Sequence, residues 1–324
     1  MNPYTGHDTQ CYGVEEHRLV GGKGDGMRIL EVNNGIGLEL TISLDRNADI
    51  SRLRYRGINM NYFSANGYVA PSYYDDKKDG WVKTFTAGFL TTCGLQAVGT
   101  PCTDEGMELP LHGSIGNLPA EQVWWEEKDG QLMIHATTKD ETVFGRKLRL
   151  SREIAVSLSE NVFTISDQIE NTGDQTEPIE ILYHMNMGYP LLDEDSKVFV
   201  DSSEVIARNE HAKEDIENWM HMEKPQSGYE ERCYYHTQKN GYASIYQPKI
   251  HQGLAISYDA KVLDQFVEWK MMGVRDYVLG LECGNCTPDG RDVMRKKNLL
   301  KFLEPGKTQS YEVTIQMLNE ETEN

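Results

Sequence analysis

The sequence lacks two features that would direct it to a membrane or to a nucleic acid: long apolar runs and clusters of basic residues. No stretch approaches the roughly 18 consecutive apolar residues of a membrane-spanning helix. Lysine and arginine together number 32, against 51 aspartate and glutamate residues, which gives a formal net charge of −19. This negative field repels both phosphate backbones and anionic lipid head groups. We therefore expect neither a nucleic-acid partner nor a membrane partner.

Cysteine and targeting signals are also scarce. Six cysteines in 324 residues are too few for a disulfide framework. The first residues, MNPYTGHDTQCYG, contain neither the basic nor the apolar segment of a secretion signal. Cys283 and Cys286 form a CxxC motif, but no second CxxC, HxH or HExxH motif accompanies it, so a metal site is not indicated. We expect a reduced, cytoplasmic protein without a bound metal.

Patterns typical of long helices are nearly absent, and patterns typical of strands take their place. Only Lys213–Met220 indicates a short helical turn, and Trp81–Val98 is β or irregular. Arg56-Gly57 and Asn240-Gly241 are turn signals, so we predict a hairpin at each. Further strands are predicted at Met27–Val32, Ile36–Leu44, Leu132–Thr138, Lys147–Leu158, Val162–Glu170, Glu177–Met187, Gly253–Tyr258, Val262–Lys270, Asp276–Glu282 and Gln309–Met317.

This pattern predicts an all-β fold, one large antiparallel sandwich. No linker, internal repeat or low-complexity run divides the chain, so we expect a single domain over residues 27–324. Residues 1–26 are polar and rich in glycine. We expect them to form an extended arm or lid ahead of this domain, with part of the arm disordered.

The strand that ends in Tyr183-His184-Met185-Asn186 has an unusual polar face. Because successive side chains of a strand point to opposite sides, Glu180, Leu182, His184 and Asn186 share one face. That mixture is a poor core surface but a suitable floor for a polar pocket. A single histidine on a strand is more often an ordinary hydrogen-bonded residue, so this strand alone does not identify a site.

Two other residues lie in similar polar, glycine-rich surroundings. His112 belongs to the loop Leu111-His112-Gly113-Ser114, and Glu282 closes the apolar strand Tyr277–Glu282. A glutamate at the end of an apolar strand is costly to bury unless it is paired. Its pKa is therefore a candidate for perturbation, which is typical of a proton-transfer group.

The order of these motifs resembles the aldose 1-epimerase (galactose mutarotase-like) superfamily, and within it a divergent branch of poorly assigned function. The resemblance covers about residues 27 to 318. It rests on the Leu111-His112-Gly113 loop, the Tyr183-His184 strand that turns into Tyr189-Pro190, the strand end Leu279-Gly280-Leu281-Glu282, and Leu303-Glu304-Pro305-Gly306 before a final strand. It implies an antiparallel β-supersandwich with a carbohydrate cleft, and a small-molecule sugar or sugar derivative as the partner. It gives no oligomeric state.

The resemblance also implies a mechanism. Glu282 would remove the proton of the anomeric hydroxyl, His184 would protonate the ring oxygen, and His112 would donate a hydrogen bond to the sugar. Ordinary pKa values near ~4.3 for glutamate and ~6.5 for histidine suit these roles with modest tuning. No cofactor is implied, because ring opening and closure involve no redox step. The predicted substrate-binding residues are Lys83, Asn186, Glu268, Trp269, Lys270 and Asn285.

Several alternatives stay open at this stage. The same fold can bind a sugar without acting on it. A keto-sugar lyase or isomerase could use the same acid–base pair on a proton bound to carbon. Trp269 on a strand is more often a core residue, and Lys83 and Lys270 are more often solvated surface residues. Two histidines and a carboxylate could also bind a metal, but no ligand spacing supports that interpretation.

Overall fold

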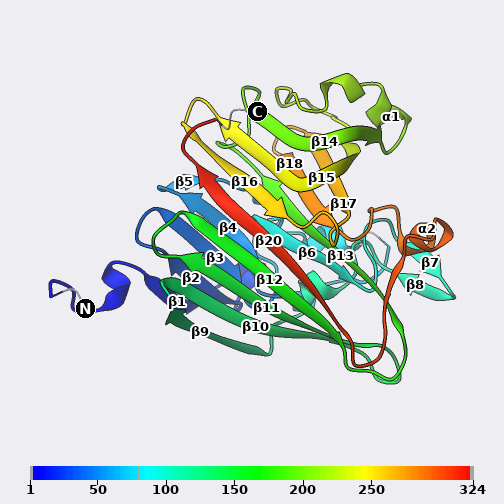
Figure 1. Cartoon of the computed structure of the whole chain (residues 1–324), viewed down its shortest axis with the longest axis horizontal. Helices are drawn as coiled ribbons and strands as arrows, with labels where there is room; N and C mark the ends of the chain where they lie inside the picture. The colour runs from blue at the N-terminus through cyan, green and yellow to red at the C-terminus, as the bar shows by residue number, and fades with distance from the viewer. Residues whose placement is uncertain (1–2, 79, 322–324) are drawn as a thin grey trace.

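The structure is a computed structural model that describes residues 3–78 and 80–321. In these ranges the chain forms a five-stranded sheet, a 13-stranded sheet and a two-stranded hairpin, with antiparallel pairing throughout the named strands. The smaller sheet lies against one part of the larger sheet (Figure 1). The predicted all-β antiparallel sandwich is therefore confirmed.

The smaller sheet contains strands β1 to β5 in sequence order, and the larger sheet contains β6, β9 to β20. The strands of the smaller sheet are β1 (Gly13–Arg18), β2 (Arg28–Asn33), β3 (Leu38–Ser43), β4 (Asp49–Tyr55) and β5 (Ile58–Asn59). The hairpin pairs β7 (Cys102–Asp104) with β8 (Met107–Leu109). The strands of the larger sheet are β6 (Leu90–Leu95), β9 (Gln122–Lys128), β10 (Gln131–Glu141), β11 (Lys147–Ser157), β12 (Val162–Asn171), β13 (Glu177–Met187), β14 (Lys197–Ala207), β15 (Arg232–Gln247), β16 (Gln252–Tyr258), β17 (Gln265–Met272), β18 (Tyr277–Gly284), β19 (Lys301–Leu303) and β20 (Thr308–Leu318).

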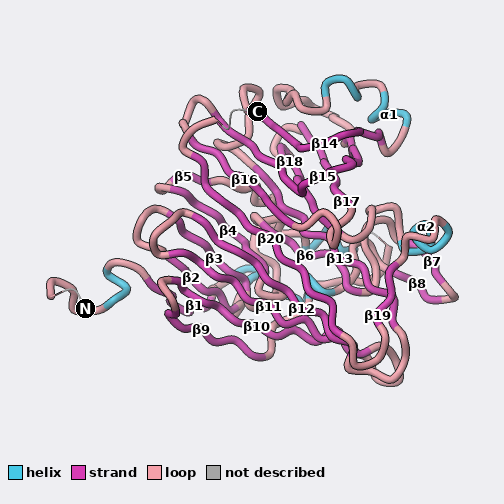
Figure 2. The backbone as a smooth tube through the Cα atoms, in the orientation of Figure 1, coloured by secondary structure: helices cyan, strands magenta, loops and turns pink. Residues whose placement is uncertain are grey.

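Helices are few and short. The two α-helices, α1 (Glu210–Lys213) and α2 (Arg291–Lys296), lie at the periphery of the sheets (Figure 2). The 3₁₀ turns are η1 (Asp8–Gln10), η2 (Gly22–Gly24), η3 (Pro71–Tyr73), η4 (Gly80–Thr84), η5 (Ile115–Asn117) and η6 (Ile216–Asn218). No helix within residues 3–78 and 80–321 is long and apolar enough to cross a membrane.

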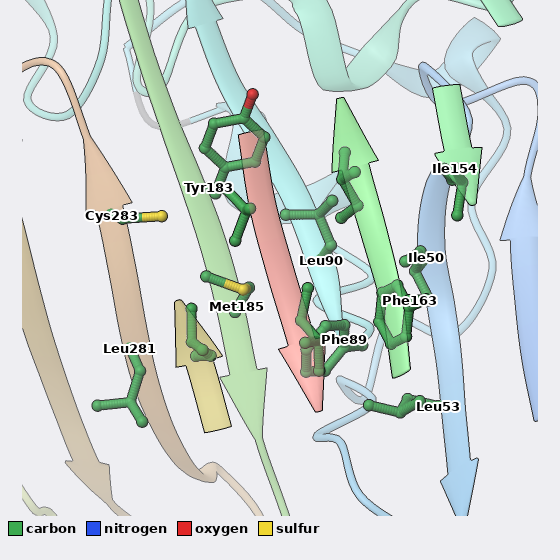
Figure 3. Close-up of a cluster of buried hydrophobic side chains, with 14 of the residues drawn as sticks. Ile50, Leu53, Phe89, Leu90, Ile154, Phe163, Tyr183, Met185, Leu281 and Cys283 are labelled. Atoms are coloured by element: carbon green, nitrogen blue, oxygen red, sulfur yellow. The ribbon is translucent and has the colours of Figure 1, made fainter. Parts of the chain in front are cut away.

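The main core lies between the two sheets. Ile50 and Leu53 of β4 meet Phe163 of β12 and the Tyr183 and Met185 side chains of β13 in one apolar cluster (Figure 3). β13 is buried on both faces from its third residue onward, whereas β10 to β12 alternate between buried and partly exposed side chains. Residues outside this core must therefore cover the second face of β13.

One buried ion cluster joins the two sheets. The Arg152 guanidinium of β11 donates to the Asp167 carboxylate at 2.7 and 2.8 Å and to the Asp49 carboxylate at 2.7 Å. Its Nη2 also donates to the Thr92 hydroxyl at 2.8 Å. The Arg152 and Asp167 side chains have no exposed surface. Such a cluster is strongly destabilised by removal of one partner, because a buried charge is then left without compensation.

The strand predictions of the middle of the chain hold closely, and so does the hairpin at Arg56-Gly57, where both residues have positive φ. The hairpin at Asn240-Gly241 is wrong, because β15 continues through both residues. Its first half pairs with β17 and its second half with β16. Gly241 is needed there for a positive φ of 64° and because a Cβ would lie 2.2 Å from the Tyr258 carbonyl oxygen.

Three local expectations also change. The α-helical turn ends at Lys213, so the predicted range Lys213–Met220 holds only the 3₁₀ turn η6. The 3₁₀ turn η4 includes Trp81–Thr84, where we expected β or irregular structure. Within the expected N-terminal arm, Gly13–Arg18 is an ordered edge strand that pairs with β2 in register. Residues 1 and 2 of that arm, and residues 322–324 of the expected domain, lie outside the described residues.

Candidate active site

A cavity of about 690 Å³ opens on the face of β13 that is turned away from the main core. Its floor comes from the neighbouring strands β13, β18, β17 and β15, and its walls come from the loops that flank β6. The predicted site residues His112, His184, Glu282, Lys83 and Trp269 all line it. The prediction that His184 and the core residues Tyr183 and Met185 face opposite sides of β13 is confirmed.

His184 and Glu282 meet at the floor of this cavity. They are direct partners in the pairing of β13 with β18, which places their side chains next to each other on one face. His184 Nδ1 lies 3.2 Å from Glu282 Oε1, and the two side chains are 6% and 2% exposed. Neither atom has an aligned hydrogen-bond partner among the described residues. Buried polar atoms left open at a cavity floor are available to a ligand.

Gly280 sets the position of the Glu282 carboxylate. Gly280, two residues before Glu282 on β18, points to the same cavity face. A Cβ at Gly280 would lie 2.3 Å from Glu282 Oε1 and 3.1 Å from the Trp269 Cβ. The carboxylate therefore occupies the volume that a side chain at position 280 would fill. This explains the Leu-Gly-Leu-Glu motif, whose glycine does not have a positive φ.

His112 approaches the pair from a constrained loop. Its φ is 57°, and the next residue, Gly113, packs so closely on the Gly94 carbonyl that a Cβ would lie 2.2 Å from that oxygen. The Gly99 N–H donates to His112 Nδ1 at 3.4 Å, which assigns the ring proton of a neutral His112 to Nε2. The His112 and His184 rings are 5.6 Å apart. His112 is thereby held as a hydrogen-bond donor beside the pair.

Burial controls the charges of these residues. Loss of solvent raises the pKa of Glu282 well above its usual value, with a further rise from the Glu231 charge and an opposing effect of Arg208. The same loss of solvent lowers the pKa of His184 to about 4 and that of His112 well below its usual value. The His184–Glu282 pair therefore carries one proton and no net charge around neutral pH.

Aromatic side chains form walls around the pair. Trp81 and Phe85 stack on each other at 4.4 Å, and Phe85 lies 5.5 Å from the His184 ring. Trp269 contacts the His184 ring edge-on at 5.3 Å, and its Nε1 donates to Glu231 Oε2 at 2.7 Å. Apolar walls around a few convergent polar groups are typical of small-molecule sites.

Four of the predicted binding residues do not line the cavity. Strand alternation turns Glu268 and Lys270 to the opposite face of β17, so a substrate contact is contradicted for both. There Glu268 Oε2 lies 3.3 Å from His236 Nε2, and Lys270 Nζ lies 3.0 Å from Glu223 Oε2.

Asn186 and Asn285 are also structural. The Asn186 amide donates to the carbonyls of Gly88 and His184, at 3.2 and 3.0 Å. Asn285 accepts from the Ile181 N–H at 2.8 Å and donates to the Tyr311 hydroxyl at 3.0 Å. Neither asparagine lines the cavity, so neither is placed to contact a ligand there.

Several other residues that line the cavity carry no recognisable signal in the sequence. Arg208 follows β14 and is held by the Thr100 hydroxyl at 2.9 Å and the Pro288 carbonyl at 3.1 Å. Glu231 and Asp276 directly precede β15 and β18, and Tyr62 lies in the loop after β5. No local pattern marks them, because each reaches the cavity only through the pairing of distant strands.

Within residues 3–78 and 80–321, no three or more His, Cys, Asp and Glu side chains are grouped so that they could hold a metal ion. The chemistry that these residues themselves offer is a paired acid and base.

Comparison with known proteins assigns the chain to a family. The model of a domain of unknown function, DUF4432, matches residues 24–317. The chain belongs to the DUF4432 family. No curated protein matches this DUF4432 chain in sequence.

Solved structures share the fold. A Klebsiella pneumoniae protein that carries the provisional name aldose 1-epimerase has a TM-score of 0.89 at 25% identity, over 95% of this chain and 84% of that chain. A galactose mutarotase-like protein from Clostridium acetobutylicum gives 0.69 at 11% identity, over 96% and 99% of the two chains. Galactose 1-epimerase from Lactobacillus acidophilus gives 0.64 at 10% identity, over 96% and 100%. The resemblance to the aldose 1-epimerase superfamily is confirmed, and the DUF4432 chain has its mutarotase-like β-sandwich.

Proposed function

We propose that this protein is an aldose 1-epimerase that interconverts the two anomers of a sugar in the cavity above β13 and β18. The observation that carries the proposal is the His184–Glu282 pair, an acid and a base 3.2 Å apart at the floor of a cavity with aromatic walls. Mutarotation requires proton transfer at two oxygens bonded to the same carbon, the anomeric hydroxyl and the ring oxygen. Two adjacent groups are therefore the arrangement that this reaction needs.

Burial favours the uncharged form of the pair, with its proton on Glu282, so the reaction begins when that proton crosses the 3.2 Å contact and leaves Glu282 a carboxylate and His184 an imidazolium. Glu282 takes the proton of the anomeric hydroxyl while His184 gives its proton to the ring oxygen. The C1–O5 bond breaks and the open-chain aldehyde forms. Rotation about C1–C2 presents the other face of the aldehyde. The ring oxygen then attacks C1 and returns its proton to His184, while the new anomeric oxygen regains a proton from Glu282. All protons and electrons balance without a cofactor.

The remaining residues orient the sugar in this proposal. His112 donates from Nε2 to a sugar oxygen, which suits its neutral state. Trp269 presents an apolar surface to a sugar face, and its hydrogen bond to Glu231 fixes the orientation of the indole. The exposed Lys83 side chain places a hydrogen-bond donor, its ammonium group, at the cavity mouth.

Replacement of Glu282 by glutamine tests the base. Glu282→Gln keeps the size of the side chain and removes the carboxylate, so turnover should fall by about 10²–10⁴-fold while sugar binding persists. Anomer interconversion is measured by saturation-transfer NMR across a panel of aldoses, and binding by calorimetry. Glu153→Gln, on the partly exposed face of β11, is the matched control and should keep the wild-type rate. Full activity of Glu282→Gln would remove Glu282 from the mechanism. A wild-type protein that binds sugars without interconverting their anomers would refute the activity.

A further inference from the structure

Glu180 lies on the same face of β13 as His184 but does not line the cavity. The two residues are four positions apart, or about 13 Å at the rise of a strand. Glu180 is 1% exposed, and its Oε1 has no hydrogen-bond partner among the described residues. A carboxyl is costly to bury, so the contact that its other oxygen makes indicates what the residue does in the fold.

That other oxygen holds the loop that follows β6. Glu180 pairs with Leu95, the last residue of β6, and beyond Leu95 the chain leaves the sheet. Three residues later the Val98 N–H donates to Glu180 Oε2 at 2.9 Å. Val98 is fully buried, so its N–H cannot turn to water instead. Loss of the carboxyl would therefore force this backbone to move or leave its N–H unpaired.

The next residue of the loop, Gly99, holds His112. Gly99 accepts from the His112 N–H at 3.0 Å and donates its own N–H to His112 Nδ1 at 3.4 Å. Its φ is 78°, and a Cβ would lie 2.1 Å from the Pro288 carbonyl oxygen, so the position requires glycine. The hydrogen bond at one ring nitrogen of a histidine sets which nitrogen carries the proton. The backbone at Val98 and Gly99 thus controls the tautomer of His112.

We propose that Glu180 is a positioning residue: by fixing Val98 it keeps the Gly99 N–H on His112 Nδ1, and so keeps the ring proton on Nε2 for the sugar. The inference rests on the proposed function. A protonated Glu180 can serve as well as a carboxylate, because it accepts through Oε2 while its proton is on Oε1. Burial raises the pKa of Glu180 to about 7, against the effects of the Val98 N–H and the Arg291 charge. Both forms therefore occur around neutral pH, and both hold Val98.

Three variants of Glu180 test this role. Glu180→Gln has the shape and the acceptor of the protonated carboxyl and should keep kcat/KM within about twofold. Glu180→Met keeps the length of the side chain but removes the acceptor. Its kcat/KM, measured by saturation-transfer NMR of anomer interconversion, should fall about tenfold, short of the roughly 10²-fold that a 1 Å misplacement can cost. Glu180→Asp, shorter by one methylene, should lose a similar factor, and it takes the place of Glu180→Met if that variant does not fold.

A double-mutant cycle separates positioning from a general structural effect. In the His112→Ala background no ring remains to be oriented, so adding Glu180→Met should cost less than about twofold further. Glu268→Met is the matched control, because Glu268 is equally buried but lies on the opposite face of β17 beside His236. Whatever factor this control costs should be the same with and without His112. Full activity of Glu180→Met, or a loss that simply multiplies with that of His112→Ala, would overturn the inference.

NMR of the His112 ring tests the same inference without any turnover. The nitrogen chemical shifts of wild type and Glu180→Gln should show an unprotonated Nδ1 and a protonated Nε2, with the signals assigned by their loss in His112→Ala. In Glu180→Met they should move toward a mixture of the two tautomers. An unchanged His112 ring in Glu180→Met refutes the role of Glu180 and leaves the mutarotase activity standing. If no aldose is interconverted, the proposed function fails, and the shift of the tautomer still decides whether Glu180 positions His112.

Discussion

Gly280→Ala should abolish most of the activity without unfolding the protein. The new methyl carbon would lie 2.3 Å from Glu282 Oε1, whereas ordinary van der Waals contact begins at 3.4 Å. The carboxylate must therefore move by about 1.1 Å, away from the position 3.2 Å from His184 Nδ1. A misplacement of about 1 Å in a catalytic geometry can cost about 10²-fold in rate. We expect a loss of that order, or about 2.7 kcal/mol in the activation barrier.

The stability of the variant should change little. The methyl group also approaches the Trp269 Cβ at 3.1 Å, a contact that relaxes with a shift of a few tenths of an ångström. Against this cost, alanine in a strand interior is favoured over glycine by roughly 0.5–1 kcal/mol, because glycine loses more conformational entropy than alanine when the chain folds. A rate that falls 100-fold at an almost unchanged midpoint of urea unfolding is therefore the expected signature.

Two comparisons make the assay specific. Gly173→Ala, in the turn between β12 and β13, brings a methyl within 3.2 Å of Asn171 Oδ1 and should keep the wild-type rate of anomer interconversion. In the Glu282→Gln background no carboxylate base remains to be displaced, so adding Gly280→Ala should cost almost nothing further. A fully active Gly280→Ala protein, or two losses that simply multiply, would show that position 280 does not act through the carboxylate.

Three further predictions concern the histidines, pH and the core. His184→Ala should lose about 10²–10⁴-fold in turnover and His112→Ala less, because the first removes the acid and the second an orienting donor; a larger loss for His112→Ala would exchange their roles. Because burial lowers the pKa of His184 to about 4 and raises that of Glu282, the pair keeps its single proton through neutral pH. The logarithm of kcat/KM, corrected for spontaneous mutarotation, should stay flat from pH 5 to 7. It should fall below about pH 4, where both groups are protonated and no base remains. A fall centred at the ordinary histidine pKa of ~6.5 would contradict this prediction. Arg152→Met should cost about 3–5 kcal/mol in the free energy of unfolding, because Asp49 and Asp167 stay buried without their partner. Arg149→Met, on the same strand and paired with a partly exposed Glu170, should cost at most about 1 kcal/mol by the same urea titration, and equal losses would refute the argument.

The sequence predicts the strands of this fold well and their partners poorly. Alternation within β10 to β13 is a local property, so the strands over Leu132–Thr138 and Glu177–Met187 could be recognised without knowing their neighbours. Asn240-Gly241 shows the limit. The same two residues suit a two-residue turn or a positive φ inside a long strand, and only the close approach of Tyr258 from β16 decides between them.

For the candidate site too, the sequence predicts individual residues better than it predicts which of them come together. His112, His184 and Glu282 were recognised because each interrupts an apolar or glycine-rich context, and their order in the chain resembles a known superfamily. The sequence does not show that His184 and Glu282 lie next to each other. The two residues are 98 positions apart, and only the register of β13 against β18 makes them partners. Glu268 and Lys270 were predicted beside Trp269 because they are its neighbours in sequence. On a strand, immediate neighbours point to opposite faces, so proximity in sequence argued for the wrong side.

That alternation also explains how one strand can serve both the core and the cavity. Tyr183 and Met185 of β13 and Leu281 and Cys283 of β18 face the main apolar cluster, where their register is held by packing. His184 and Glu282 lie between them in sequence and face the cavity. A slip of β13 against β18 by one residue would turn the whole apolar set out of the core, so the register is strongly specified. The cost of that slip is what fixes His184 opposite Glu282, and Gly280 then fixes the carboxylate. The geometry of the acid and base is thus set by the packing of the residues on either side of them, which is why a single methyl at position 280 should disturb the reaction more than the fold.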